Sequence, residues 1–273
     1  MEPINQRKTD HIEIVSQDGA VDRRQAYFDR IHLTHRALPE MALSEVDPST
    51  TFLGKKLSFP LLISSMTGGA DAELVRINRN LAQAAEAEGV ALAVGSQRVF
   101  LSDEAARASF ELRQCAPSAL LLGNLGAVQL NHGLGLADCE AAVQVLDADG
   151  LYLHLNPLQE AVQPEGDTDF SALRSKIAVV AQDLKVPVVV KEVGAGISPE
   201  DVERLLSAGI QHIDVAGAGG TSWSLVESRR SDDPELGELF KGWGIPTPLA
   251  LRRLKPWLDE ARLVASGGDR KSV

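Results

Sequence analysis

The residues with the clearest chemical potential surround the dipeptide Gln159-Glu160, which follows the apolar segment 150–155. Alternate residues of a strand face the same side of a sheet, so His154 and Asn156 point the same way. If that side is the inside of a barrel, a histidine, two amides and one carboxylate converge at the carboxyl end of the strand. Such a cluster suits a divalent cation that carries a phosphate-rich substrate. A strand end whose polar tip faces water is an equally weighted alternative.

Other apolar segments also end in residues that could bind a ligand. Lys191 ends the segment 186–191, where a lysine is costly to bury without an anionic partner. A flavin ring that is anionic when reduced would be such a partner, and an ion pair with Glu192 is the structural alternative. Arg98, in Gly-Ser-Gln-Arg, could hold a phosphate through two hydrogen bonds or lie on the surface. Asn124 could bind the edge of a heterocycle or cap a turn.

Three glycine-containing segments and a basic cluster add further candidates. Ser65-Met66-Thr67-Gly-Gly offers a thioether, hydroxyls and backbone donors to a planar ring, or forms a glycine turn before a helix. The segments 217–221 and 266–268 offer backbone N–H groups for a phosphate, and their place on neighbouring strands strengthens this interpretation. Arg7-Lys8-x-x-His11 is either a solvated tail or a hook that folds over a diphosphate.

The elements that must position these residues are short apolar segments that alternate with amphipathic ones. This alternation predicts a parallel sheet with helices on both faces. Spacings of about 25–35 residues favour a TIM (β/α)₈ barrel over a doubly wound sheet. A Rossmann sheet would need G-x-G-x-x-G after the first strand, which this chain lacks. The expected strands are 60–65, 90–95, 119–123, 150–155, 186–191, 212–216 and 262–266, and the expected helices are 73–88, 103–115, 136–147, 170–184 and 198–208.

Three segments fall outside this alternation. Residues 1–55 are expected to form an irregular polar arm that packs over the barrel, which occupies 56–273. Residues 224–248 are charged and contain proline and glycine, as is typical of a lid or binding loop. The seventh strand is followed only by residues 267–273, so we expect seven of eight strands, a C-terminally truncated barrel and half of the usual phosphate grip.

Composition narrows the class of protein. The 273 residues are 44% hydrophobic and 24% charged, and the net charge of −11 argues against a nucleic-acid partner. No apolar run approaches the ~18 residues of a membrane span, and no signal peptide begins the chain. Cys115 and Cys139 share no metal-ligand spacing, and together with His132 and His212 they are assigned to structure. These features predict a cytoplasmic protein.

Taken in order along the chain, eight segments strongly resemble the type 2 isopentenyl diphosphate isomerases. The most specific are His-Leu-Asn-Pro-Leu-Gln-Glu at 154–160 and Gly-Gly-Thr-Ser-Trp at 219–223. The resemblance implies an FMN-dependent barrel that interconverts isopentenyl and dimethylallyl diphosphate, with Mg²⁺ and a reductant such as NADPH, and a homo-oligomer (tetramer or octamer). The segments are 7–11, 65–69, 95–98, 123–124, 154–160, 190–194, 216–223 and 265–268.

The resemblance also implies roles for individual residues. Reduced flavin N5 is the acid/base centre in this family, and Gln159 and His154 are the catalytic side chains, with Gln159 orienting the substrate or relaying a proton. Glu160 is expected to hold Mg²⁺. The expected FMN ligands are Ser65, Met66, Thr67, Ser96, Asn124, Lys191, Thr221, Gly267 and Gly268, and the expected substrate ligands are Arg7, Lys8, Arg98, His154, Asn156 and Gln159.

Two departures from the family pattern leave alternatives open. Ala216 stands where the family usually has serine, and residues 269–273 do not continue the family's sequence, so the activity of this chain is left open. One alternative is an FMN-dependent α-hydroxyacid oxidase, although such enzymes place a histidine and an arginine late in the barrel. The other is a barrel without catalytic activity.

Overall fold

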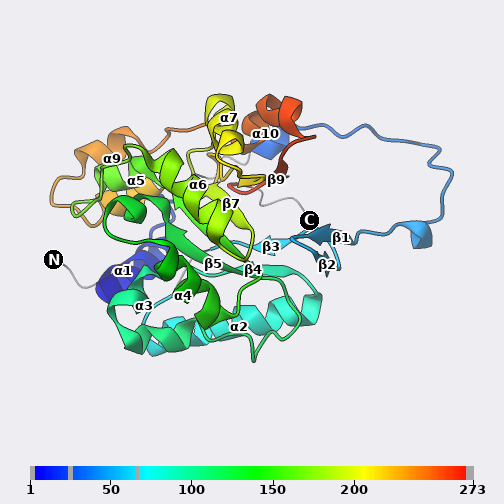
Figure 1. Ribbon diagram of the computed structural model, residues 1–273. Helices are drawn as coiled ribbons and strands as arrows, with labels where there is room; N and C mark the ends of the chain where they lie inside the picture. Colours follow the sequence, from blue (N-terminus) through cyan, green and yellow to red (C-terminus); the bar gives the residue numbers. More distant parts are fainter. Residues whose placement is uncertain (1–3, 24–26, 66–67, 269–273) are drawn as a thin grey trace.

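A seven-stranded parallel sheet organises the chain in the computed structural model, which describes residues 4–23, 27–65 and 68–268. The strands follow one another in sequence order, and each pairs in parallel with the next, so the sheet curls as in a barrel (Figure 1). This confirms the predicted (β/α) barrel architecture with seven strands in the described chain. The strands are β3 (Leu62–Ile63), β4 (Ala91–Ala93), β5 (Leu121–Gly126), β6 (Gly150–Leu155), β7 (Val188–Glu192), β8 (His212–Asp214) and β9 (Arg262–Val264).

Helices separate these strands, mostly where amphipathic segments were predicted. Helix α2 begins at the cap Asp71, whose carboxylate accepts the N–H of Glu73 at 2.8 Å, and it ends at Gly89 with φ +63°. The main helices are α2 (Ala72–Glu88), α3 (Arg98–Ser102), α4 (Leu136–Leu146), α5 (Pro157–Val162), α6 (Leu173–Asp183), α7 (Pro199–Ser207) and α10 (Thr247–Leu254).

The helix predicted over 103–115 is wrong. Asp103 instead caps a 3₁₀ helix, η3 (Glu104–Ser109), after which the backbone turns. Phe110 and Leu112 are both fully buried. Residues two apart do not share one face of a helix, so burying both is incompatible with a surface helix.

The interior of the sheet is closed at one end and open at the other. His154 pairs in register with Lys191, and Lys191 with Asp214, so these side chains share the inner face. Below them Tyr152 packs in an apolar cluster with Val189. The antiparallel hairpin of β1 (Thr50–Phe52) and β2 (Lys55–Leu57) covers this amino end of the strands. The polar residues therefore face the opposite, carboxyl end.

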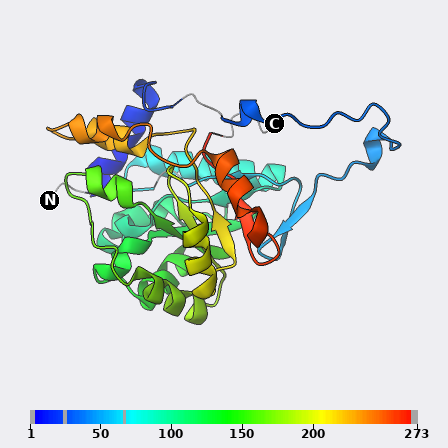
Figure 2. The same ribbon diagram turned by 90° about the horizontal axis from the view of Figure 1, so that it is seen from above.

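The arm divides into parts with different roles. Residues expected to be irregular form α1 (Ile4–Gln17), where His11 lies edge-on to Trp223, with ring centroids 5.1 Å apart. Arg23 donates to the carbonyl of Gly194 at 2.7 Å and so fixes the chain after α1 to the loop after β7. Residues 31–49 extend away from the body (Figures 1 and 2). Helix α1 and the segment after it therefore lie at the open end of the barrel.

The segment expected as a loop over 224–248 contains two short helices. These are α8 (Trp223–Ser228) and α9 (Glu235–Leu239), and Ser228 Oγ joins them by donating to the carbonyl of Pro234 at 3.0 Å. Helix α8 is almost wholly buried because it packs beneath α1 and beside α5. It thereby brings acidic and aromatic side chains to the barrel's open end.

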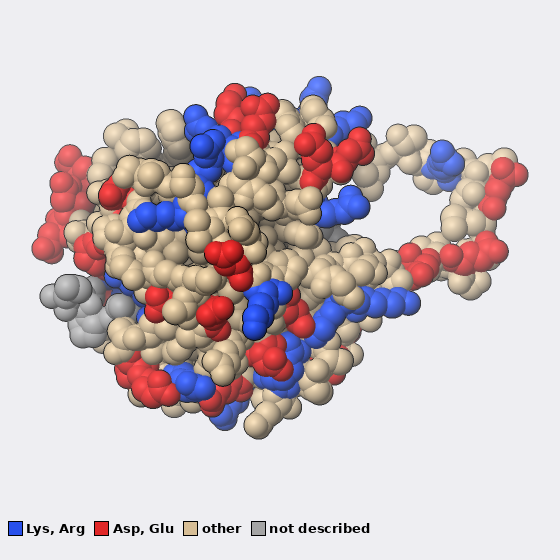
Figure 3. All heavy atoms as spheres, in the orientation of Figure 1, with Lys and Arg blue, Asp and Glu red and all other residues tan. Residues whose placement is uncertain are grey.

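On the outer surface, acidic and basic side chains are interspersed over the face shown in Figure 3, and acidic ones mark the tip of the projecting segment. Within the described ranges, no helix combines the length and apolar character needed to cross a membrane.

Candidate functional site

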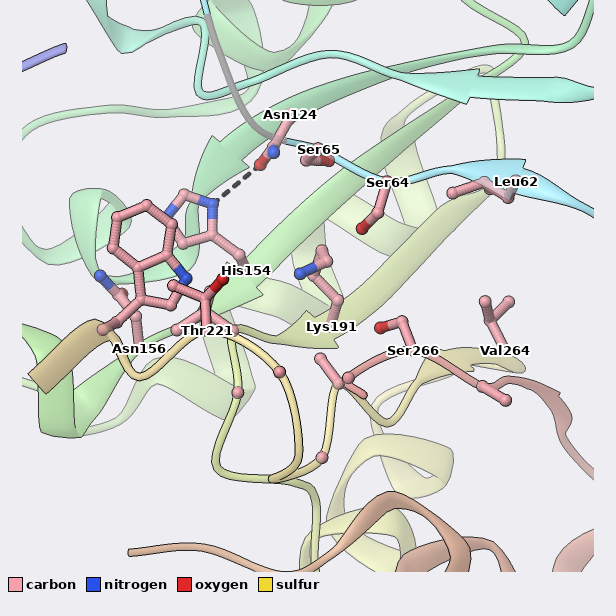
Figure 4. Close-up of a pocket in the computed structure, with 18 of the residues that line it drawn as sticks. Leu62, Ser64, Ser65, Asn124, His154, Asn156, Lys191, Thr221, Val264 and Ser266 are labelled. Atoms are coloured by element: carbon pink, nitrogen blue, oxygen red, sulfur yellow. Dashed lines mark hydrogen bonds between the residues drawn. The ribbon is translucent and has the colours of Figure 1, made fainter. Parts of the chain in front are cut away.

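A pocket of about 1060 Å³ extends from the carboxyl ends of the strands, along β3 and β9, to the β1–β2 hairpin. Figure 4 shows side chains from β5, β6, β7 and the loops after β8 and β9 pointing into it. Met66 and Thr67 lie outside the described residues. All the other predicted site residues line the pocket: Arg7, Lys8, Ser65, Ser96, Arg98, Asn124, His154, Asn156, Gln159, Glu160, Lys191, Thr221, Gly267 and Gly268.

His154 is held as a neutral hydrogen-bonding group. Its Nδ1 lies 2.8 Å from Asn124 Oδ1, and the amide of Asn124 is oriented because Nδ2 donates to the carbonyl of Val94 at 3.0 Å. Burial, together with the charges of Lys191, Lys8 and Arg7, lowers the pKa of His154 to about 3. Nδ1 therefore carries the proton, and Nε2 is left as an acceptor.

Asn156 organises the dipeptide Gln159-Glu160 at the start of α5. Asn156 Nδ2 donates to Glu160 Oε1 at 2.8 Å and to Gln159 Oε1 at 3.2 Å. Burial raises the pKa of Glu160, and hydrogen bonds from the Asp167 N–H and from Asn156 only partly offset this. Asn156 Oδ1 is buried with no hydrogen-bond partner in the described chain. A carboxylate and an amide oxygen thus lie together, both suited to a cation.

Glu227 of α8 contacts the pocket residue Gln159, and the sequence did not single it out. It is fully buried, and its Oε1 accepts a hydrogen bond from Gln159 Nε2 at 2.7 Å. His11 Nε2 lies 3.1 Å from the same oxygen, and Arg230 lies 2.6 Å from Oε2. Burial opposes ionisation, but His11, Gln159 and Arg230 lower the pKa of Glu227 to about 2. Gln159 is consequently fixed with its amide nitrogen toward α8.

Three cations from two distant segments face the same part of the pocket. Arg7 and Lys8 come from α1, and Arg98 begins α3. Burial and the neighbouring Arg7 lower the pKa of Lys8 to about 8. Arg98 forms an ion pair at 3.0 Å with Asp167, which sequence analysis did not assign. Positive charge therefore accumulates where Glu160 could place a metal.

Lys191 occupies the other half of the pocket, at the end of β7. Its Nζ donates to the backbone carbonyl of Glu192 at 2.6 Å and lies 5.8 Å from the centre of the Tyr152 ring. The Glu192 carboxylate turns the other way and accepts the backbone N–H groups of residues 193–196. Lys191 is therefore held by the backbone carbonyl of Glu192 and not by an ion pair with the Glu192 side chain.

The two glycine segments after β8 and β9 pack directly on each other. Gly267 and Gly268 have φ of +96° and +76°. A Cβ on Gly267 would lie 2.0 Å from the carbonyl oxygen of Gly217, and one on Gly268 would lie 2.7 Å from the Cα of Gly219. Side chains longer than hydrogen are thus excluded at both positions. Below them the buried Asp214 accepts a hydrogen bond from Ser266 Oγ at 2.5 Å.

A metal would have few protein ligands here. Among the described residues, no group of three or more histidine, cysteine or acidic side chains is arranged to hold a metal ion. A cation at Glu160 would therefore take most of its ligands from a substrate and from water, as Mg²⁺ commonly does with phosphates.

The residues assigned to structure divide between two kinds of environment. Cys139 is buried, and burial raises its pKa to about 12, whereas Cys115 is partly buried in a turn. His212 lies edge-on to Phe52 at the closed end of the sheet. His132 instead lies 3.5 Å from Asp167, which pairs with the pocket residue Arg98, so His132 has a polar partner near the site.

Comparison with known proteins agrees with this geometry. The family model described as FMN-dependent dehydrogenase matches residues 3–116. Among solved structures, mandelate oxidase with a monooxide FMN adduct has a TM-score of 0.55 at 16% identity, covering 90% of this chain and 69% of that one. Mandelate oxidase with benzoyl-formic acid has a TM-score of 0.56 at 14% identity, and the match covers 90% of this chain and 68% of that one. The likeness to the solved structures confirms the fold as that of a TIM barrel.

Curated relatives are far more similar in sequence. The isopentenyl-diphosphate delta-isomerase of Paracoccus zeaxanthinifaciens is 59% identical, over 98% of this chain and 78% of the relative. That of Hydrogenovibrio crunogenus is 54% identical, over 99% of this chain and 80% of the relative. That of Methanothermobacter thermautotrophicus is 43% identical, over 99% of this chain and 75% of the relative. The chain belongs to the isopentenyl-diphosphate delta-isomerase family and is an isomerase by descent.

Proposed function

We propose that the chain interconverts isopentenyl diphosphate and dimethylallyl diphosphate by moving a proton, with reduced FMN and Mg²⁺ bound in the pocket. The names of the relatives suggest the substrate, and the family model suggests the cofactor. One observation carries the proposal. A single pocket combines cations and a carboxylate suited to a magnesium diphosphate with a lysine and two glycine loops suited to a flavin.

Two observations support FMN in the flavin half of the pocket. Ser65 Oγ is buried without a hydrogen-bond partner in the described chain. The two glycine loops, which pack on each other, line the pocket with backbone and no bulky side chain at Gly217, Gly220, Gly267 and Gly268. When bound and reduced, FMN would supply the centre that delivers and removes the alkene proton, with a reductant such as NADPH to keep it reduced. The residues that would hold it are Ser65, Ser96, Asn124, Lys191, Thr221, Gly267 and Gly268.

In the diphosphate half of the pocket, the properties of Glu160 and Asn156 are suited to binding a magnesium ion. Burial raises the pKa of Glu160 by more than its hydrogen bonds and Arg7 lower it, and a divalent cation beside it would favour the ionised carboxylate. Asn156 Oδ1 offers a further oxygen without a partner. Arg7, Lys8 and Arg98 would neutralise the phosphates.

The described side chains that face this half of the pocket include no strong acid for an alkene. His154 is neutral at pH 7, because its pKa of about 3 is far below that value. Gln159 is an amide that does not titrate, and Glu227 is ionised. These residues would therefore orient the substrate and exclude water, and Gln159 would be positioned by Glu227.

The test is an anaerobic assay of the purified chain with FMN, dithionite, Mg²⁺ and isopentenyl diphosphate, followed by NMR of the products. We expect dimethylallyl diphosphate to form, and Glu160→Gln to reduce its rate by at least about tenfold. FMN at about 100 times its dissociation constant should add about 2.7 kcal/mol of stability, or about 5–10 °C in Tm.

The alternatives predict different results. Reduction of bound flavin by lactate or mandelate, without isomerisation, would favour an α-hydroxyacid oxidase, whose structures share only the fold at 14–16% identity. No flavin binding and no change in Tm would favour a barrel without catalytic activity.

A further inference from the structure

Asp167 connects the two groups that would bind the diphosphate and its metal. Its Oδ2 accepts hydrogen bonds from Arg98 Nη1 at 3.0 Å and from Gln129 Nε2 at 2.8 Å. Its Oδ1 lies 3.5 Å from His132 Nδ1. Its backbone N–H donates to Glu160 Oε2 at 2.7 Å. Asp167, in the loop after α5, thus contacts Arg98 of α3 through its side chain. Through its backbone it contacts Glu160, the proposed metal ligand.

The Arg98–Asp167 ion pair is expected to stabilise the fold only slightly. The side chains of Arg98 and Asp167 are 33% and 21% exposed. Partly exposed pairs of this kind contribute little to stability. Holding a long arginine in one conformation has a cost in side-chain entropy. If that cost is met before the ligand arrives, the ligand binds more tightly.

We propose that Asp167 is a positioning residue for diphosphate binding, which holds the guanidinium of Arg98 in the pocket wall and the carboxylate of Glu160 through its backbone N–H. The inference rests on the proposed function, since it gives Arg98 and Glu160 their ligands. The two contacts of Asp167, with Arg98 and with Glu160, can be separated by experiment. Asp167→Asn removes the charge that holds Arg98 but keeps the N–H that binds Glu160.

Asp169 provides a matched control in the same segment. It lies two residues further on, and its Oδ1 accepts hydrogen bonds from Ser171 N and Oγ. Neither Asp167 nor Asp169 lines the pocket itself, so the two residues differ in their hydrogen-bond partners rather than in access to a ligand. Asp169→Asn therefore makes the same change of charge close to the site without touching Arg98.

The experiment measures binding of inorganic diphosphate with Mg²⁺ to the FMN-loaded protein by isothermal titration calorimetry. We expect Asp167→Asn to weaken binding about tenfold, as loss of a supporting partner commonly does, and Asp169→Asn to leave it unchanged. FMN affinity should be the same in both variants, which shows that the pocket is folded. Unchanged or tighter diphosphate binding by Asp167→Asn would overturn the inference.

A double variant tests whether Asp167 acts through Arg98. In an Arg98→Gln background, Asp167→Asn should weaken binding by much less than tenfold, because residues in one network are not additive. A full tenfold loss in that background would contradict the mechanism. If the unsubstituted chain binds no magnesium diphosphate, the proposed function fails and this inference with it. If it binds, only the variants decide the role of Asp167.

Discussion

At the scale of single residues, burial and hydrogen-bonded or charged partners together set the charges in and around the pocket. His154 is neutral and Glu227 ionised across the usual pH range, because their pKa values of about 3 and 2 lie well below it. Lys8 differs, since burial and Arg7 lower its pKa to about 8 from a usual value near 10.4. In the free protein it is charged below pH 8 and loses that charge as the pH rises above 8.

The affinity for a diphosphate should follow the charge of Lys8. At pH 9 roughly a tenth of Lys8 is protonated, so its contribution to affinity can fall by up to about tenfold between pH 7 and pH 9. The Lys8→Met variant should bind magnesium diphosphate more weakly at pH 7 and change less over this range. Calorimetry at both pH values measures this. The ligand's own titration is common to both proteins, so identical pH profiles would rule out Lys8 as the cause.

At the scale of elements, the contact between the two glycine loops decides whether the flavin half can form. Gly267 has φ +96°, and a Cβ there would lie 2.0 Å from the Gly217 carbonyl oxygen. Gly209, at the end of α7, has φ +82° but nothing within 4 Å of the same position. The two sites therefore share the conformational strain and differ in the clash.

Alanine at these two positions should separate strain from loop packing. Gly209→Ala should cost only about 1–2 kcal/mol, the usual strain of a left-handed residue, and leave FMN affinity unchanged. Gly267→Ala should cost more than this and weaken FMN binding at least about tenfold, because the loops must separate. Urea denaturation and fluorescence titration with FMN measure the two effects. Equal FMN affinity in both variants would show that the loop contact does not support the cofactor.

Elements also explain what the sequence could and could not predict. The strand ends were predictable because consecutive parallel strands place their carboxyl ends together, so Asn124, His154 and Lys191 had to meet. Glu227 was not, because it lies in a short helix without clear periodicity, and its partner His11 comes from the far end of the chain. The three-residue spacing of Lys8 and His11 is a helical signal that could have indicated α1.

At the scale of the whole molecule, apolar surface is exposed away from the pocket. In the segment that extends from the body, Leu33, Leu38 and Leu43 are 90%, 76% and 89% exposed (Figure 2). Among the described strands, none pairs with the outer edges of β3 and β9. Apolar patches and open edges both favour association with other chains. A homo-oligomer is therefore expected, with the extended segment at its interface.

Serine at Leu33, Leu38 and Leu43 together tests this assembly. The side chains make few contacts within the chain, so stability should change by less than about 0.5 kcal/mol and Tm by less than about 2 °C. Light scattering during size-exclusion chromatography should show a smaller mass at micromolar concentration. Val179, which is 54% exposed on α6, provides the control, and Val179→Ser should leave the mass unchanged. An unchanged mass in the triple variant would mean that association, if present, uses the strand edges or another face.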